Sequence, residues 1–151
     1  MISCDTNILY AACDAASKEH AAARQWLSGQ VQNPEFVLCE QVLMELYCLL
    51  RNPAVAKPPL PAAEAARVVS ILRTNPVWRI VDVPAGSREL MNQVWAAASE
   101  RSFAYRRIFD LRLAFTLRHH GVTTFATRNV RDFQACGFSR VIDPAAGAVN
   151  R

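Results

Sequence analysis

The sequence lacks several features that would point to common classes of protein. No apolar run approaches the roughly 18–20 residues that a membrane-spanning helix requires, and no basic segment precedes an apolar one as in a signal peptide. None of the five cysteines forms a CxxC pair, which argues against a zinc site or a disulfide framework. The P-loop pattern G-x-x-x-x-G-K-S/T is absent too. We therefore expect a cytoplasmic protein without membrane contact.

Lysine is also scarce: of the 17 residues that are lysine or arginine, 15 are arginine. The arginines are unevenly placed. Residues 101–140 contain eight Arg and two Asp, whereas residues 1–100 contain eight basic and ten acidic side chains. Guanidinium groups match the geometry of phosphate oxygens, so this local excess favours a polyanion as partner. An ordinary solvated basic face is the alternative.

The apolar pattern predicts strands that alternate with helices. Strands are expected at 2–5, 35–38, 77–83, 123–126 and 141–142, and helices at 18–28, 40–51, 62–73, 87–101 and 108–120, with a short turn or helix at 130–135. No two strands are joined by a hairpin turn. The pattern therefore predicts an α/β fold, an open and mostly parallel sheet covered by helices on both faces, in one domain over 1–151. Cys4, Cys39, Cys48 and the three tryptophans are expected in the core.

Polar side chains follow two of the predicted strands. Asp5 comes directly after the first strand, with no Lys or Arg before Lys18 to pair with it, and Asn129 and Asp132 follow the strand at 123–126. In open α/β sheets the functional site lies outside the carboxyl ends of the strands. We expect these side chains to converge there. As alternatives, Asp5 caps a helix that starts at Thr6, and Asp132 caps its turn or pairs with Arg128.

Two further carboxylates lie among apolar residues. Glu45 lies in VLMELYCLL and Asp110 in IFDLRLAF. Glu45 could extend to solvent beside Gln41, and Asp110 could pair with Arg106 or Arg107 one turn back. Several carboxylates at one sheet edge, however, cannot all ionise unless a cation compensates them. Oxygen-only ligands select Mg²⁺ or Mn²⁺, and the arginine-rich surroundings then favour a phosphodiester backbone as substrate.

Four stretches together resemble a known family. They are CDTNILYAA at 4–12, QVLMEL at 41–46, IFDLRLAF at 108–115 and TTFATRNVRDF at 123–133. Their order and spacing resemble the PIN-domain nucleases, and among them the VapC-type toxins of toxin–antitoxin modules. The resemblance implies a three-layer α/β/α sandwich with a short parallel sheet. It also implies a homodimer, a small antitoxin as partner, and a Mg²⁺- or Mn²⁺-dependent endoribonuclease that cleaves RNA.

The resemblance also implies roles for individual residues. Asp5, Glu45 and Asp110 would hold the metal, and Asp132 would be a fourth catalytic acid. Many PIN domains carry an acid near the position of Asn129, whereas this chain has an amide there and its acid three residues later. The surrounding polar side chains would position the carboxylates, water or phosphate: Thr6, Asn7, Thr127, Asn129, Arg128 and Arg131. The alternatives are a non-catalytic subunit acting with an antitoxin as a DNA-bound autorepressor, and a DNA-directed nuclease.

Overall fold

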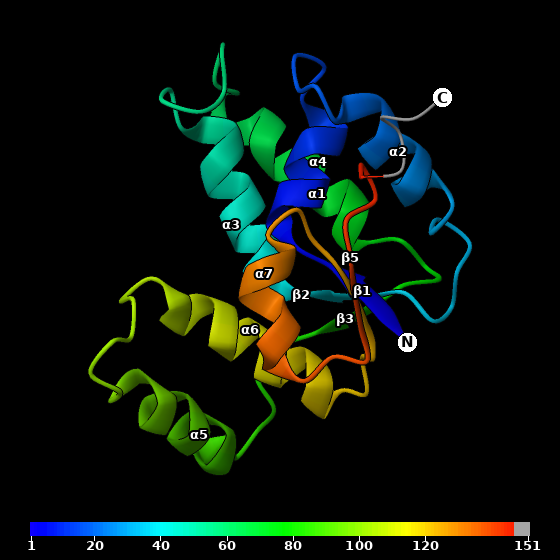
Figure 1. The fold of residues 1–151 in the computed structure, drawn as a ribbon. Helices are drawn as coiled ribbons and strands as arrows, with labels where there is room; N and C mark the ends of the chain where they lie inside the picture. Colours follow the sequence, from blue (N-terminus) through cyan, green and yellow to red (C-terminus); the bar gives the residue numbers. More distant parts are fainter. Residues whose placement is uncertain (147–151) are drawn as a thin grey trace.

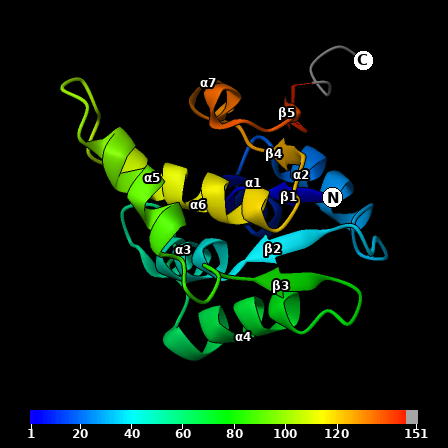
Figure 2. The ribbon, with the colours of Figure 1, turned by 90° about the horizontal axis from the view of Figure 1, so that it is seen from below.

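Short parallel strands form the centre of the fold (Figure 1). In the computed structural model, which describes residues 1–146, β1 (Ile2–Cys4), β4 (Thr124–Ala126) and β5 (Arg140–Ile142) form one sheet in the order β1-β4-β5. β2 (Val37–Cys39) and β3 (Arg79–Val81) lie side by side in a second sheet (Figure 2). A parallel bridge between Ile2 and Phe36 links the two sheets. All strands therefore present their carboxyl ends at one edge.

Helices lie on both sides of these strands (Figure 1). One group contains α1 (Thr6–Cys13), α2 (His20–Ser28), α3 (Glu40–Arg51) and α4 (Ala62–Arg73), which pack against one another. The other contains α5 (Arg88–Ala98) and α6 (Arg107–His119), and α6 also contacts α7 (Val130–Phe133) and the 3-10 turn Gln134–Cys136. This arrangement confirms the predicted α/β fold with a short parallel sheet.

Local sequence explains where several helices begin and end. α3 and α4 have the predicted bounds, and α3 ends at Arg51 because the following Asn52-Pro53 disfavours helical backbone. α6 is followed by Gly121 in the left-handed region, at φ 84°, which suits the predicted helix-ending glycine. α1 was not among the predicted helices. The alternative that Asp5 caps a helix starting at Thr6 is correct, because its side chain accepts a hydrogen bond from the Thr6 N–H.

The core lies between the strands and the helices and is rich in phenylalanine. Phe125 stacks on Phe138 at a centroid distance of 4.9 Å, and Cys4 and Cys39 are fully buried as expected. Two core predictions are wrong: Cys48 is exposed, and Trp95 on α5 is 59% exposed, because both point away from the packed helix faces. Among residues 1–146, no helix has the length and apolar character needed to cross a membrane. Residues 147–151 of the predicted domain lie outside the described part.

Candidate active site

Asp5 is the central carboxylate of the site. It follows β1 directly, is 8% exposed, and its N–H donates to the Ala126 carbonyl oxygen of β4 at 2.8 Å. Oδ1 accepts from the Thr6 N–H at 2.7 Å and so caps α1. Oδ2 accepts from Thr127 Oγ1 at 2.6 Å and from Asn7 Nδ2 at 2.7 Å. Capping therefore explains only one of the two oxygens, and the second belongs to a separate polar network.

That network joins the DTN segment after β1 to the TRN segment after β4. Asn7 Nδ2 donates to Thr127 Oγ1 at 3.2 Å, and the Arg128 N–H donates to Asn7 Oδ1 at 3.2 Å. The Asn129 N–H donates to Thr127 Oγ1 at 3.0 Å, and Thr127 is fully buried. The expected convergence of these two strand ends is therefore present. Thr127 and Asn7 fix the Asp5 carboxylate, while Asn129 contributes through its backbone.

Glu45 lies on α3, half-buried, and both of its carboxylate oxygens accept hydrogen bonds. Thr6 Oγ1 donates to Oε2 at 2.8 Å, and Gln41 Nε2 donates to Oε1 at 3.0 Å. Thr6 thus contacts two predicted site carboxylates, Asp5 through its N–H and Glu45 through its hydroxyl. Glu45 lies beside Gln41, as in the alternative, but it is only partly exposed and both of its carboxylate oxygens are held by hydrogen bonds.

Asp110 lies in the first turn of α6 and brings the acids into one electrostatic group. Its pKa is raised to about 6, first by burial and then by the charges of Asp5, Asp132 and Glu45, while Arg107 opposes the shift. Asp5, Asp132 and Glu45 are therefore close enough to Asp110 to raise its pKa. Arg107 forms no ion pair with Asp110 and donates its Nη2 hydrogen bond to the Asp132 carbonyl oxygen at 3.4 Å.

Asp132 and the nearby Arg128 and Arg131 are exposed, as is Asn129. Asp132 lies on α7, exposed, and the alternative that it pairs with Arg128 is wrong. The Arg128 guanidinium instead pairs with Glu19 at 2.6 Å, because Glu19 lies next to the TRN segment in space. Arg131 is exposed and, within residues 1–146, forms no ion pair.

Within the described part of the chain, the four carboxylates Asp5, Glu45, Asp110 and Asp132 have no direct ion-pair partner, and Arg107 only partly offsets the charge at Asp110. Burial raises the pKa of the Asp5 carboxyl, against the hydrogen bonds from Thr127 and Thr6, and the Glu45 charge raises it further. A divalent cation would relieve this repulsion. The donor set is oxygen only, which fits Mg²⁺ or Mn²⁺.

The spacing of the carboxylates limits how such an ion could be held. Within the described residues, no group of three or more His, Cys, Asp and Glu side chains is already placed to hold a metal ion. Mg²⁺ commonly binds through one or two carboxylates and keeps several water molecules. The residues therefore fit an ion held by some of these carboxylates directly and by others through water.

Comparison with known proteins decides the family. The family model described as PIN domain matches residues 2–138. The chain belongs to the PIN-domain family. Ribonuclease VapC24 of Mycobacterium tuberculosis is 48% identical over 144 residues, which are 95% of this chain and 97% of that protein. This identity places the chain with the VapC-type members of the family.

Solved structures show the same PIN fold at lower identity. The crystal structure of VapC20 from Mycobacterium tuberculosis, a sarcin–ricin loop cleaving toxin, is 22% identical, with a TM-score of 0.62 over 91% of this chain and 96% of that chain. A toxin–antitoxin complex from Klebsiella pneumoniae is 18% identical, with a TM-score of 0.57 over 95% of this chain and 98% of that chain. These likenesses confirm the predicted PIN-like architecture.

The PIN domain also contains residues at the site that the sequence did not assign to it. Gln41 contacts Glu45 directly, and Arg112 Nη1 donates to Gln41 Oε1 at 2.6 Å. The position of Gln41 one helical turn before Glu45 is a signal that the sequence does contain. Arg112 lies 71 residues from Gln41, so no local pattern could have linked them.

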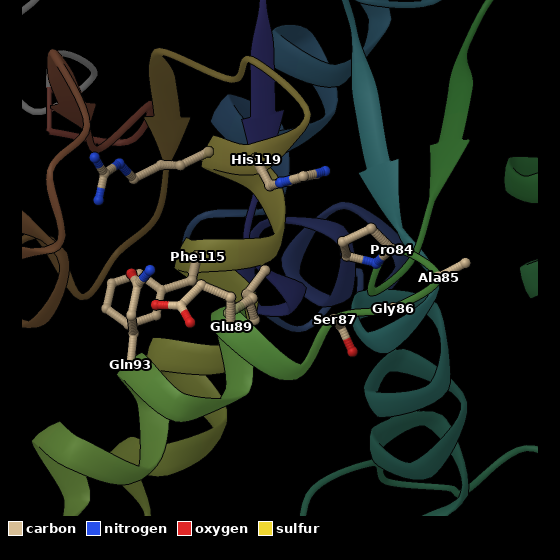
Figure 3. Close-up of a pocket in the computed structure, with 10 residues that line it drawn as sticks. Pro84, Ala85, Gly86, Ser87, Glu89, Gln93, Phe115 and His119 are labelled. Atoms are coloured by element: carbon tan, nitrogen blue, oxygen red, sulfur yellow. The ribbon is translucent and has the colours of Figure 1, made fainter.

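The PIN domain has a cavity of about 500 Å³ that is separate from the carboxylates (Figure 3). It lies between the loop before α5, α5 itself and the last turns of α6, and its lining includes Ser87, Glu89, Phe115, Arg118 and His119. None of the four predicted acids lines it. Asp110 lies at the opposite end of α6, so the candidate active site is the carboxylate group at the strand ends and not this cavity.

Proposed function

We propose that this PIN domain is a Mg²⁺- or Mn²⁺-dependent endoribonuclease, the toxin of a toxin–antitoxin pair, acting in the cytoplasm. The observation that carries the proposal is the group of four carboxylates, one directly after β1 and the others on α3, α6 and α7, without an ion-pair partner among residues 1–146. A protein that only binds a partner has no physical reason to accept this repulsion. The relative at 48% identity is named a ribonuclease, which supports the same activity.

In this proposal the chain contributes a rigid set of oxygen donors. Asp5, Glu45 and Asp110 would hold the ion, directly or through water, and Asp132 would add negative charge from α7. A bound divalent ion supplies Lewis-acid polarisation of the scissile phosphoryl group and lowers the pKa of water. Thr127 and Asn7 fix the Asp5 carboxylate, and Thr6 fixes Asp5 and Glu45 relative to each other. The products would carry 5′-phosphate and 3′-hydroxyl ends.

Exposed apolar and basic side chains next to the carboxylates support single-stranded RNA as the substrate. Phe109 directly precedes Asp110 and is 59% exposed. Arg106 lies 5.8 Å from the ring centre of exposed Tyr105, one turn before Phe109. Aromatic surfaces interleaved with cations are the usual means of binding unpaired nucleotides, because the rings stack on bases and the cations meet phosphates.

Replacing Phe109 with alanine is expected to raise the Kd for single-stranded RNA about ten-fold, since stacking contributes on the order of 1–3 kcal/mol per base. Fluorescence anisotropy of a labelled RNA in EDTA, where cleavage is suppressed, measures this. Trp95→Ala is the matched control, because Trp95 is also 59% exposed but lies on α5. A specific role for Phe109 would be contradicted if both variants bound RNA equally weakly, or if neither bound RNA more weakly than wild type.

We propose a second copy of the chain and a small antitoxin as partners. Met44 on α3 and Ile71 on α4 are 56% and 65% exposed, and a groove between these two helices is lined by Leu43, Tyr47 and Val69. Exposed apolar side chains of this size are typical of protein–protein contact surfaces. The toxin–antitoxin complex among the structural neighbours supports an antitoxin.

Expression in a bacterial host tests the activity, with RNA 5′ ends mapped afterwards. We expect growth arrest and discrete 5′-phosphate ends, and we expect the purified protein to cleave RNA with Mg²⁺ or Mn²⁺ but not with EDTA. Cleavage of single-stranded DNA in place of RNA would favour the DNA-directed nuclease. Promoter DNA binding with a partner protein, and no cleavage of either nucleic acid, would favour the non-catalytic subunit.

A further inference from the structure

Gln41 connects the two helices that carry Glu45 and Asp110. The residue is 5% exposed and lies in the first turn of α3. Its Nε2 donates to Glu45 Oε1 and to the Phe109 carbonyl oxygen, both at 3.0 Å. Its Oε1 accepts from Arg112 Nη1 at 2.6 Å. One buried amide therefore contacts the Glu45 carboxylate and the peptide group that directly precedes Asp110.

The neighbours of Gln41 allow only one orientation of its amide. A guanidinium group has hydrogen-bond donors and no acceptor. Arg112 can therefore form a hydrogen bond with the amide oxygen of Gln41 but not with its amide nitrogen. The Glu45 carboxylate and the Phe109 carbonyl are acceptors, so they require the amide nitrogen. A flipped amide would place a donor against Arg112 and an acceptor against Glu45 at the same time. The guanidinium of Arg112 thus determines that Gln41 presents its donors to Glu45.

Arg112 is itself held from the other side. Its Nη2 lies 3.5 Å from Asp82 Oδ1, and Asp82 follows β3 at the carboxyl edge of the sheet. The contacts form a continuous series from Asp82 through Arg112 and Gln41 to Glu45. Asp82 also stands at a strand end, but its charge is matched by Arg112. The series therefore ends at the one carboxylate in it that has no cationic partner, Glu45.

We propose that Gln41, oriented by Arg112, is a positioning residue that holds Glu45 in its metal-binding orientation. The inference rests on the proposed metal-dependent cleavage. Both Glu45 oxygens are fixed, Oε1 by Gln41 and Oε2 by Thr6, so that the carboxylate is oriented before an ion binds. In this role Gln41 and Arg112 act through Glu45 and need no contact of their own with the ion. Groups that orient a ligand in this way typically change metal affinity or activity about 10–100-fold when removed.

Binding of Mn²⁺ to purified variants, measured from the EPR signal of free Mn²⁺, tests the proposal without relying on activity. Gln41→Met is expected to raise the Kd for Mn²⁺ about 10–100-fold. It should raise the Mn²⁺ concentration for half-maximal RNA cleavage in parallel, with cleavage largely restored at saturating Mn²⁺. Gln41→Leu removes the same amide with a branched side chain that packs differently from methionine, so it is expected to weaken Mn²⁺ binding to a similar extent and keeps the test valid where the methionine variant folds poorly.

A double-mutant cycle tests whether Arg112 acts through Gln41. Arg112→Met is expected to weaken Mn²⁺ binding, and the Gln41→Met/Arg112→Met pair is expected to bind no more weakly than Gln41→Met alone. Arg73→Met is the matched control, because Arg73 on α4 pairs at 2.7 Å with Glu40 on α3, the helix of Gln41, without contacting Glu45. The control should leave Mn²⁺ affinity unchanged.

The outcomes separate this inference from the proposed function. If wild type binds Mn²⁺ and cleaves RNA while Gln41→Met and Gln41→Leu bind Mn²⁺ as tightly, the positioning role is wrong and the proposed function stands. Additive losses in the double variant would exclude the path through Gln41. A wild-type protein that neither binds Mn²⁺ nor cleaves RNA would overturn the proposed function itself.

Discussion

Asp5→Asn is expected to lower RNA cleavage by at least about 100-fold, the scale of losing one preorganised electrostatic contact in an active site. The asparagine keeps an oxygen that can accept from the Thr6 N–H, so the cap of α1 survives. Its amide nitrogen would face the donors Asn7 Nδ2 and Thr127 Oγ1, and it carries no charge for a cation. Cleavage of a labelled RNA, followed at saturating Mg²⁺, measures the loss.

The fold of the Asp5→Asn variant should be intact. Burial raises the pKa of Asp5, so the folded protein disfavours the carboxylate charge that the substitution removes. This gain offsets the lost hydrogen bond, and we expect the melting temperature to stay within a few degrees of wild type. Glu64→Gln on α4 is the control, because it makes the same chemical change at an exposed position. Near wild-type cleavage by the Asp5 variant would remove Asp5 from the mechanism.

Much of the fold could be predicted from the sequence because proline and glycine residues mark the ends of several helices. Asn52-Pro53 and Gly121 end helices by backbone geometry alone, and the predicted bounds of α3 are those observed. α1 was missed because its eight residues, TNILYAAC, continue the apolar character of β1 without a polar face that would mark a helix. The sequence offered a helix after Asp5 only as an alternative, and the structure decides for it.

The parts of the candidate site that lie at strand ends could be predicted from the sequence. The contacts between individual side chains on different helices and loops could not. Asp5 and Thr127 meet because parallel strands end at one edge, a rule that needs no coordinates. Arg128 was expected near phosphate, but its partner Glu19 lies 109 residues away and is visible only in the folded chain. The contact of Arg112 with Gln41 is of the same kind. Apolar setting and strand position identify the acids, whereas their supporting contacts require the structure.

Asp110→Asn is expected to abolish most cleavage, by about 100-fold or more, and at the same time to stabilise the metal-free protein at neutral pH. The pKa of Asp110 is raised to about 6, so between about pH 4 and pH 6 the folded state binds more protons than the unfolded state. Stability therefore falls as pH rises through this window and stays lower above it. The asparagine does not titrate and escapes this loss.

The size of the stability effect follows from the exposure of Asp110, which is only half-buried. Because solvent screens the charge, the raised pKa of Asp110 lowers the free energy of unfolding at neutral pH by only about 1 kcal/mol. This corresponds to roughly 2–4 °C in melting temperature. In EDTA, the variant should melt above wild type at pH 7.5 and match it near pH 4, after subtraction of the Glu64→Gln control. Mg²⁺ should raise the melting temperature of wild type more than that of the variant, because a bound cation compensates the acids and stabilises the folded state. A variant that is less stable than wild type at pH 7.5 in EDTA would mean that the helix dipole at the start of α6, and not repulsion among the acids, dominates at this carboxylate.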